Sequence, residues 1–192
     1  VSMGKTPLIY YVVGHNELDV SESFKNEFGK RNYEVRNLNI TEEKGVPEDC
    51  DILLMTTPAA DYSKDEADYV LEYLAKDGNA MVFIDSKKDI PNFERILADY
   101  GVKAGNALIF EGDSDRYYQY PINIMPEIKS SDVTKQLKQS GYPMIISYAQ
   151  GIDILELKKE SISVEPIFTT SNSSYGKVSD NPKTFNFEEG DK

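Results

Sequence analysis

The feature that most constrains the fold is a short apolar run near the start of the chain, which ends abruptly on polar residues. Residues 8–13 read Leu-Ile-Tyr-Tyr-Val-Val, and Gly14, His15, Asn16 and Glu17 follow directly. A buried strand ending at a glycine and a polar tip is typical of α/β sheets, which present side chains in the crevice at the carboxyl ends of their strands. The run therefore predicts a central strand. Residues 14–17 after it, called the tip below, contain the one histidine of the chain and form the first candidate site.

Strand-like and helix-like segments alternate along the first hundred residues. Apolar spacing predicts helices over residues 18–31, after Ser63 and after Pro91, and strands over residues 33–40, 51–57 and 80–85. Ser63 and Glu66 have the spacing of a capping box, and Gly78 is expected to end that helix in a left-handed conformation. Such alternation indicates parallel strands with helices on both faces. We therefore predict an α/β fold: a three-layer sandwich with a mostly parallel sheet, either flavodoxin-like or class I glutamine amidotransferase-like.

The last third of the chain has a different character. Residues 107–110 predict a short strand, residues 111–120 are polar and rich in tyrosine, and residues 143–157 and 161–170 predict two β segments. From residue 169 onward small polar and charged residues dominate, which is typical of a loop or linker. A chain of 192 residues fits one domain. We predict a single α/β domain over residues 1–175 and a polar tail over residues 176–192.

Composition excludes several classes of partner and site. The chain has 33 acidic and 21 basic residues, a net charge of −12, and no basic cluster. Nucleic acids and anionic membrane surfaces are therefore not expected as partners, because binding phosphates requires clustered lysine and arginine. The single cysteine, Cys50, excludes an internal disulfide and a multi-cysteine metal site. No window approaches the roughly 18–20 apolar residues that span a bilayer, and no signal peptide is recognisable.

The sequence lacks the usual patterns of an active site. The tip after the first strand has neither the G-x-G-x-x-G nor the Walker spacing. Residues 85–88 follow the predicted fourth strand as Asp-Ser-Lys-Lys, without a cysteine or the glycines of a nucleophile elbow. His15, Glu17, Asp61 and Asp85 can gather at the sheet edge, but their spacing is not that of a metal site. We expect no catalytic residue, metal or cofactor. The simpler interpretation is that His15 caps a helix or bonds to loop backbone, while a Ser86–His15 hydrolase remains open.

A binding crevice is the alternative function. Thr57 and Pro58 follow the predicted third strand, and Tyr117 and Tyr118 offer faces on which a ligand can stack. This interpretation predicts a carbohydrate- or peptide-binding domain that uses the carboxyl ends of the strands. Its candidate residues are Gly14, His15, Asn16, Glu17, Thr57, Pro58, Asp61, Asp85, Tyr117 and Tyr118. The simpler interpretations are a proline-fixed turn leading to Ser63, and tyrosines that cover a sheet edge.

Several segments, taken in order, resemble a known family. They are residues 11–17, 46–53, 58–66, 73–78, 81–85 and 164–171, which include Tyr-Val-Val-Gly-His-Asn-Glu, Val-Pro-Glu-Asp-Cys-Asp-Ile-Leu and Val-Glu-Pro-Ile-Phe-Thr-Thr-Ser. Together they are similar to the auxiliary domain of ABC-type transport systems, whose best-known member is the G subunit of the gliding-motility transporter. The resemblance covers residues 7–175. It implies an amidotransferase-like sandwich without the catalytic cysteine, related to a domain of an intraflagellar-transport subunit.

The resemblance also implies a function. It implies a non-enzymatic, extracytoplasmic domain of a bacterial ABC transporter accessory protein, acting in assembly or substrate presentation. The implied partners are the permease and ATPase subunits, with a glycan or peptide as a possible ligand. In the family, transmembrane helices flank such domains, so the resemblance implies anchoring at the cell membrane by helices that this sequence does not contain. One departure is that Gly78-Asn79 replaces the family's usual glycine pair.

Overall fold

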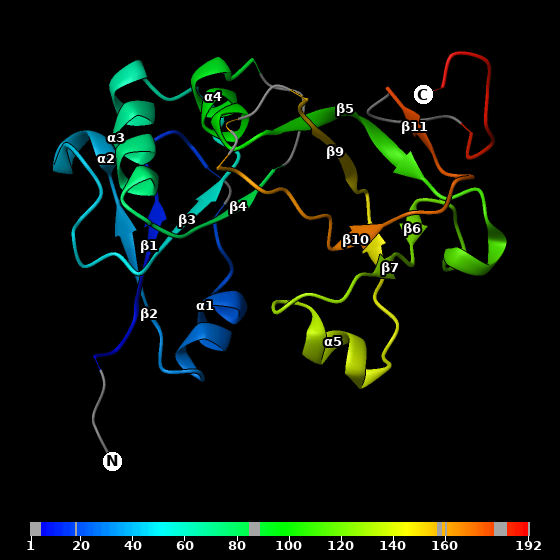
Figure 1. Cartoon of the computed structure of the whole chain (residues 1–192), viewed down its shortest axis with the longest axis horizontal. Coiled ribbons are helices and arrows are strands. Elements are labelled where there is room, and N and C mark those ends of the chain that lie inside the picture. The colour runs from blue at the N-terminus through cyan, green and yellow to red at the C-terminus, as the bar shows by residue number, and fades with distance from the viewer. Residues whose placement is uncertain are drawn as a thin grey trace. The chain divides into compact units, whose positions relative to one another are not determined.

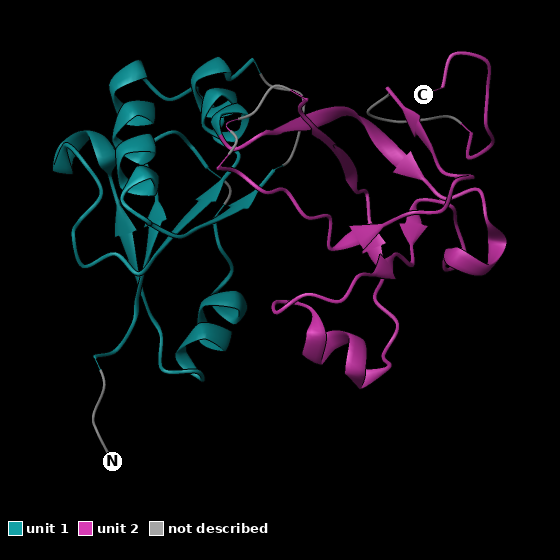
Figure 2. Cartoon of the chain, viewed as in Figure 1, with its two compact units in different colours: residues 1–99 teal, residues 100–192 magenta. Residues whose placement is uncertain are grey.

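The protein divides into two compact units, residues 1–99 and residues 100–192 (Figure 2). The computed structural model describes residues 5–17, 19–84, 89–156, 159, 161–178 and 184–191. Asp85 and Ser86 lie outside the described residues. The division into a domain over residues 1–175 and a tail over residues 176–192 stays a prediction.

Unit 1 contains a four-stranded parallel sheet, which confirms the predicted parallel pairing (Figure 1). Its order is β2-β1-β3-β4, and the strands are β1 (Leu8–Val12), β2 (Glu34–Leu38), β3 (Ile52–Thr56) and β4 (Ala80–Phe83). The helices are α1 (Glu22–Gly29), α2 (Ile40–Glu43), α3 (Lys64–Ala75) and α4 (Pro91–Asp99). The finer expectation of a three-layer flavodoxin-like or amidotransferase-like sandwich stays a prediction.

The central strands of unit 1 are buried on both faces. All five residues of β1 are buried, as are Leu53, Leu54 and Met55 of β3. Ile9 and Tyr11 pack with α1, whose Phe24 and Phe28 meet edge to face. Because side chains alternate along a strand, the other β1 residues face the opposite side of the sheet. The continuous apolar runs of the sequence therefore have the burial expected of central strands in a parallel sheet.

Unit 1 differs from the predicted boundaries at three points, and local capping explains the first two. The first helix begins at Glu22 rather than at residue 18, because the Ser21 side chain accepts a hydrogen bond from the Phe24 amide. Strand β2 ends at Leu38, because Asn39 caps the short helix α2, which the sequence analysis did not predict. The left-handed residue after α3 is Asp77, with φ of 63°, rather than Gly78.

Unit 2 is built from short antiparallel pairings. Its largest sheet has the order β11-β5-β9, with β5 (Val102–Phe110), β9 (Gln150–Ile154) and β11 (Tyr175–Lys177). Two further pairs are β6 (Asn123–Ile124) with β8 (Ile146–Ser147), and β7 (Glu127–Ile128) with β10 (Phe168–Thr169). The remaining elements are the 3-10 turn η1 (Ser114–Arg116) and α5 (Lys135–Ser140).

The strands of unit 2 differ in extent from those predicted. Strand β5 begins at Val102 rather than at residue 107, because its first half pairs with β9. Strand β11 lies in the segment expected to be loop, because Tyr175 stacks on Phe110 in a small core that includes Ile122. No helix among the described residues is long and apolar enough to cross a membrane.

Candidate functional site

The tip after β1 has a backbone shape that depends on Gly14. Gly14 has φ of 124°, a region that side chains rarely tolerate, and Asn16 is left-handed with φ of 54°. The His15 amide donates to Glu17 Oε2 at 2.9 Å, and its carbonyl accepts from the amides of Ala59 and Ala60. The tip is therefore tied to the loop that follows β3.

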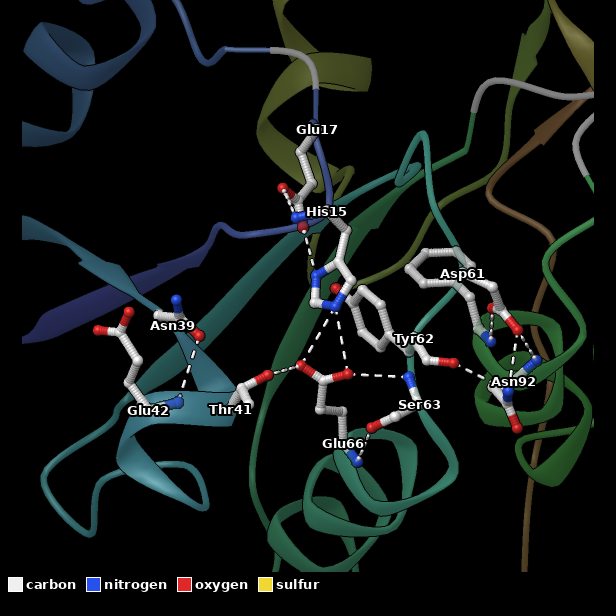
Figure 3. Close-up of polar contacts among 11 residues, drawn as sticks. His15, Glu17, Asn39, Thr41, Glu42, Asp61, Tyr62, Ser63, Glu66 and Asn92 are labelled. Atoms are coloured by element: carbon white, nitrogen blue, oxygen red, sulfur yellow. Dashed lines mark hydrogen bonds and ion pairs between the residues drawn. The ribbon is translucent and has the colours of Figure 1, made fainter.

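The His15 ring lies between two carboxylates (Figure 3). Its Nδ1 is 3.2 Å from Glu17 Oε1, and its Nε2 is 3.1 Å from Oε1 and 3.2 Å from Oε2 of Glu66. The three side chains are only 12%, 3% and 5% exposed, in the order His15, Glu17 and Glu66. Both ring nitrogens therefore have a carboxylate oxygen within hydrogen-bond distance.

Glu66 connects His15 to the start of α3. Its Oε2 accepts from the Ser63 amide at 2.8 Å, and its own amide donates to Ser63 Oγ at 3.2 Å, which confirms the predicted capping box. Thr41 Oγ1 donates to the other carboxylate oxygen. Burial alone would raise the pKa of Glu66, but hydrogen bonds from Thr41 and Ser63 and the neighbouring His15 outweigh it, so this pKa lies below its usual value.

Tyr62 forms the apolar wall of this cluster. Its ring centroid is 4.6 Å from that of His15 and 5.4 Å from that of Phe93 on α4, where the contact is edge to face. The side chain is 1% exposed, and its hydroxyl has no hydrogen-bond partner among the described residues. Burial, and secondarily the charges of Glu17 and Glu66, raises the pKa of Tyr62 far above its usual range. Tyr62 therefore stays neutral and contributes packing.

Asp61 caps helix α4. Its carboxylate accepts from the amides of Asn92 and Phe93 at 3.0 and 3.1 Å, and also from the Asn92 side chain at 2.9 Å. These amides lie in the first turn of α4, where backbone donors have no partner within the helix. Asp61 is thus a cap supplied from a distant part of the chain.

Replacing Asp61 with alanine should lower the free energy of unfolding by about 1–2 kcal/mol, because two first-turn amides of α4 lose their acceptor. Urea denaturation followed by circular dichroism measures the change. Asp65→Ala is the matched control, since Asp65 lies in the first turn of α3 and is exposed. Equal losses in the two variants would contradict the capping role.

The structure brings only some of the predicted site residues together. Gly14, His15, Asn16 and Glu17 form the tip, and Thr57 and Pro58 are buried beside the end of β3. Asp61 points toward α4, and Asp85 lies outside the described residues. Tyr117 and Tyr118 belong to unit 2. The described residues contain no group of three His, Cys, Asp or Glu side chains that could hold a metal ion.

Three residues of the cluster around His15 could not be assigned to it from the sequence. Glu66 was recognised as a capping residue, but nothing in its spacing pointed to His15, which lies 51 residues earlier. Thr41 gave no signal, because it belongs to the unpredicted helix α2. Tyr62 stood next to the predicted cap without an assigned role. His15 was interpreted as a possible helix cap. In the structure its ring contacts the capping residue Glu66 and not the helix amides themselves.

Comparisons with known proteins give one family and one related fold. A family model described as an ABC-type uncharacterized transport system matches residues 6–192. Among solved structures, the chain is similar to the mmIFT52 N-terminal domain with a TM-score of 0.63 and 11% identity, over 87% of this chain and 74% of that one. At this identity the likeness concerns the fold alone. No curated protein matches the chain.

Proposed function

Because the chain belongs to the ABC-type uncharacterized transport system family, we propose that it is a non-enzymatic accessory domain that associates with the permease and ATPase subunits of such a transporter. In this proposal it acts on the extracytoplasmic face of the cell membrane, in assembly or in substrate presentation. In this proposal its role resembles that of the gliding-motility G subunit. Its fold would be an amidotransferase-like sandwich without the catalytic cysteine.

The environment of His15 supports the proposal that this domain is not an enzyme. A histidine that serves as a general base needs a free ring nitrogen within hydrogen-bond reach of the group it deprotonates. Here both nitrogens already face carboxylate oxygens, those of Glu17 and Glu66. The imidazole therefore supports a structural tip that joins β1, α2 and the start of α3, and the outer surface of that tip is available for docking a partner.

Affinity purification of the full-length protein in its native membrane tests the transporter association. After detergent solubilisation, we expect a permease and an ATPase to be recovered with the tagged protein in fixed proportion. An unrelated membrane protein carrying the same tag is the control for nonspecific recovery. If the protein fractionates without either subunit, also after chemical cross-linking in intact cells, the accessory role is wrong.

A further inference from the structure

Unit 2 contains a cavity of about 490 Å³. The residues that line it include four aromatic residues and two asparagines: Tyr117, Tyr175, Phe185, Phe187, Asn172 and Asn186. Its size lies in the range of small-ligand sites. Of the tyrosine-rich segment in which stacking faces were predicted, Tyr117 reaches this cavity.

Two phenylalanines at the cavity are exposed although the surrounding sequence is polar. Phe187 is 65% exposed and Phe185 is 42% exposed. Phe185 packs against Phe110 and Tyr120, and Phe187 meets Tyr175 edge to face at 5.6 Å. Each ring is therefore held by aromatic neighbours while much of its surface remains in contact with water. Neighbouring aromatic rings that are exposed beside a cavity are a common feature of ligand-binding sites.

The segment that carries these rings is anchored to β11. The Lys177 side chain is 4% exposed, and its Nζ lies 2.9 Å from Asp191 and 3.1 Å from Glu188. The Tyr175 hydroxyl donates to the Phe185 carbonyl. A buried ammonium requires such partners, so these contacts hold residues 184–191 in place. A rim that is ordered before binding loses less conformational entropy when a ligand arrives.

Close backbone packing shapes the other side of the cavity. A Cβ added at Gly112 would lie 2.3 Å from the Ser173 carbonyl oxygen, so these two loops approach as closely as they do only with glycine at this position. Both oxygens of the buried Glu111 carboxylate are occupied: one accepts from the Ser171 amide at 2.9 Å, and the other from the Asp113 amide and the Ser171 hydroxyl. The other described residues of the lining have no charged side chain.

We propose that this cavity binds a neutral saccharide. A sugar ring has an apolar C–H face that packs on aromatic rings, here Phe187 and Tyr117, and a rim of hydroxyls that pair with amide groups such as those of Asn172 and Asn186. Because the described lining contains no lysine or arginine, an anionic ligand would find no counter-charge.

Binding of defined neutral oligosaccharides to the full chain tests the proposal. The probes are the hexasaccharides of glucose in α-1,4 and β-1,4 linkage, of N-acetylglucosamine, of mannose and of xylose, with oligogalacturonate as the anionic comparison. We expect saturable binding of at least one neutral probe by isothermal titration calorimetry. Phe187→Ala should weaken it about tenfold, the order expected when one stacking partner is lost. Tyr142→Ala, at a 76% exposed tyrosine of unit 2 outside the lining, should leave it unchanged.

Each alternative result overturns the proposal in a recognisable way. Absence of binding by all neutral probes at millimolar concentration excludes the ligand class. Binding that is equal in Phe187→Ala and the unmodified protein would show that the saccharide binds outside this cavity. Preference for oligogalacturonate would show that the site does not select neutral saccharides. Recovery of transporter subunits from membranes is measured separately, so failure here does not alter the outcome of that experiment.

Discussion

Replacing Glu66 with alanine should lower the free energy of unfolding by about 3 kcal/mol, because it removes the acceptor of a capping box and leaves a nearly buried histidine with one anionic partner. Glu66 contacts His15, Ser63 and Thr41, and its side chain is 5% exposed. The variant therefore loses contacts among three segments at once. Urea denaturation with detection by far-ultraviolet circular dichroism measures the loss.

Glu72→Ala provides a control in the same helix. Glu72 pairs with Lys76 at 2.7 Å, but its side chain is 62% exposed, so its removal should cost less than about 0.5 kcal/mol. Similar losses in both variants would show that the contribution comes from general helix stability and not from the His15 cluster.

The Glu66 contribution should also depend on pH. Its pKa in the folded protein lies below the ordinary value of 4.5, so the unfolded chain binds more protons between these two values. The stabilisation is therefore fully present above about pH 5 and is lost as the pH falls through the folded pKa. The stability difference between Glu66→Gln and the unmodified protein should shrink accordingly in acid, and a difference that stays constant from pH 7 to pH 3 would contradict this account.

Replacing Phe93 with alanine should destabilise unit 1 by about 3–5 kcal/mol, the usual cost of removing a buried aromatic ring. Phe93 is 1% exposed and meets the edge of Tyr62, which in turn packs on the His15 ring. Loss of this ring leaves a cavity beside the core and removes support from the tip. Amide hydrogen exchange in β1 and α4 measures the change within unit 1.

Phe83→Ala is the matched control for this prediction. Phe83 lies on β4, is 47% exposed and meets Phe24 edge to face at 5.8 Å. Its truncation should cost about 1 kcal/mol or less, because little apolar area leaves the solvent at that position. If amide hydrogen exchange in β1 accelerates equally in the two variants, Phe93 does not stabilise unit 1 more than an exposed phenylalanine does.

The strands and helices of unit 1 could be predicted because their signals are local. Each signal lies within a short stretch of sequence: the apolar run of β1, the capping pair Ser63 and Glu66, and the apolar stripe of α4. Unit 2 was harder to predict, because its strands are as short as two residues and pair over long distances. The run that contains β11 has almost no strand signal apart from Tyr175.

The candidate site could likewise be predicted only in part. The sequence indicated the tip at Gly14 and His15, since a glycine and polar residues after a buried strand mark the edge of a sheet. It could not show that Asp61 turns to α4, nor that Tyr117 lies in unit 2. Those placements depend on how separate segments pack, and residue spacing along one chain does not contain that information.

The class of unit 1, its parallel pairing and the start of its helix at Ser63 could all be inferred from the sequence, because periodicity and capping arise from interactions between residues a few positions apart. The partners of the polar groups, in contrast, depend on the three-dimensional packing of distant segments. His15 meets Glu66 across 51 residues, and Glu111 meets Ser171 across 60. Such pairs form because a buried charge or hydrogen-bonding group must find a partner wherever the fold places one, and that partner is chosen by packing rather than by sequence distance.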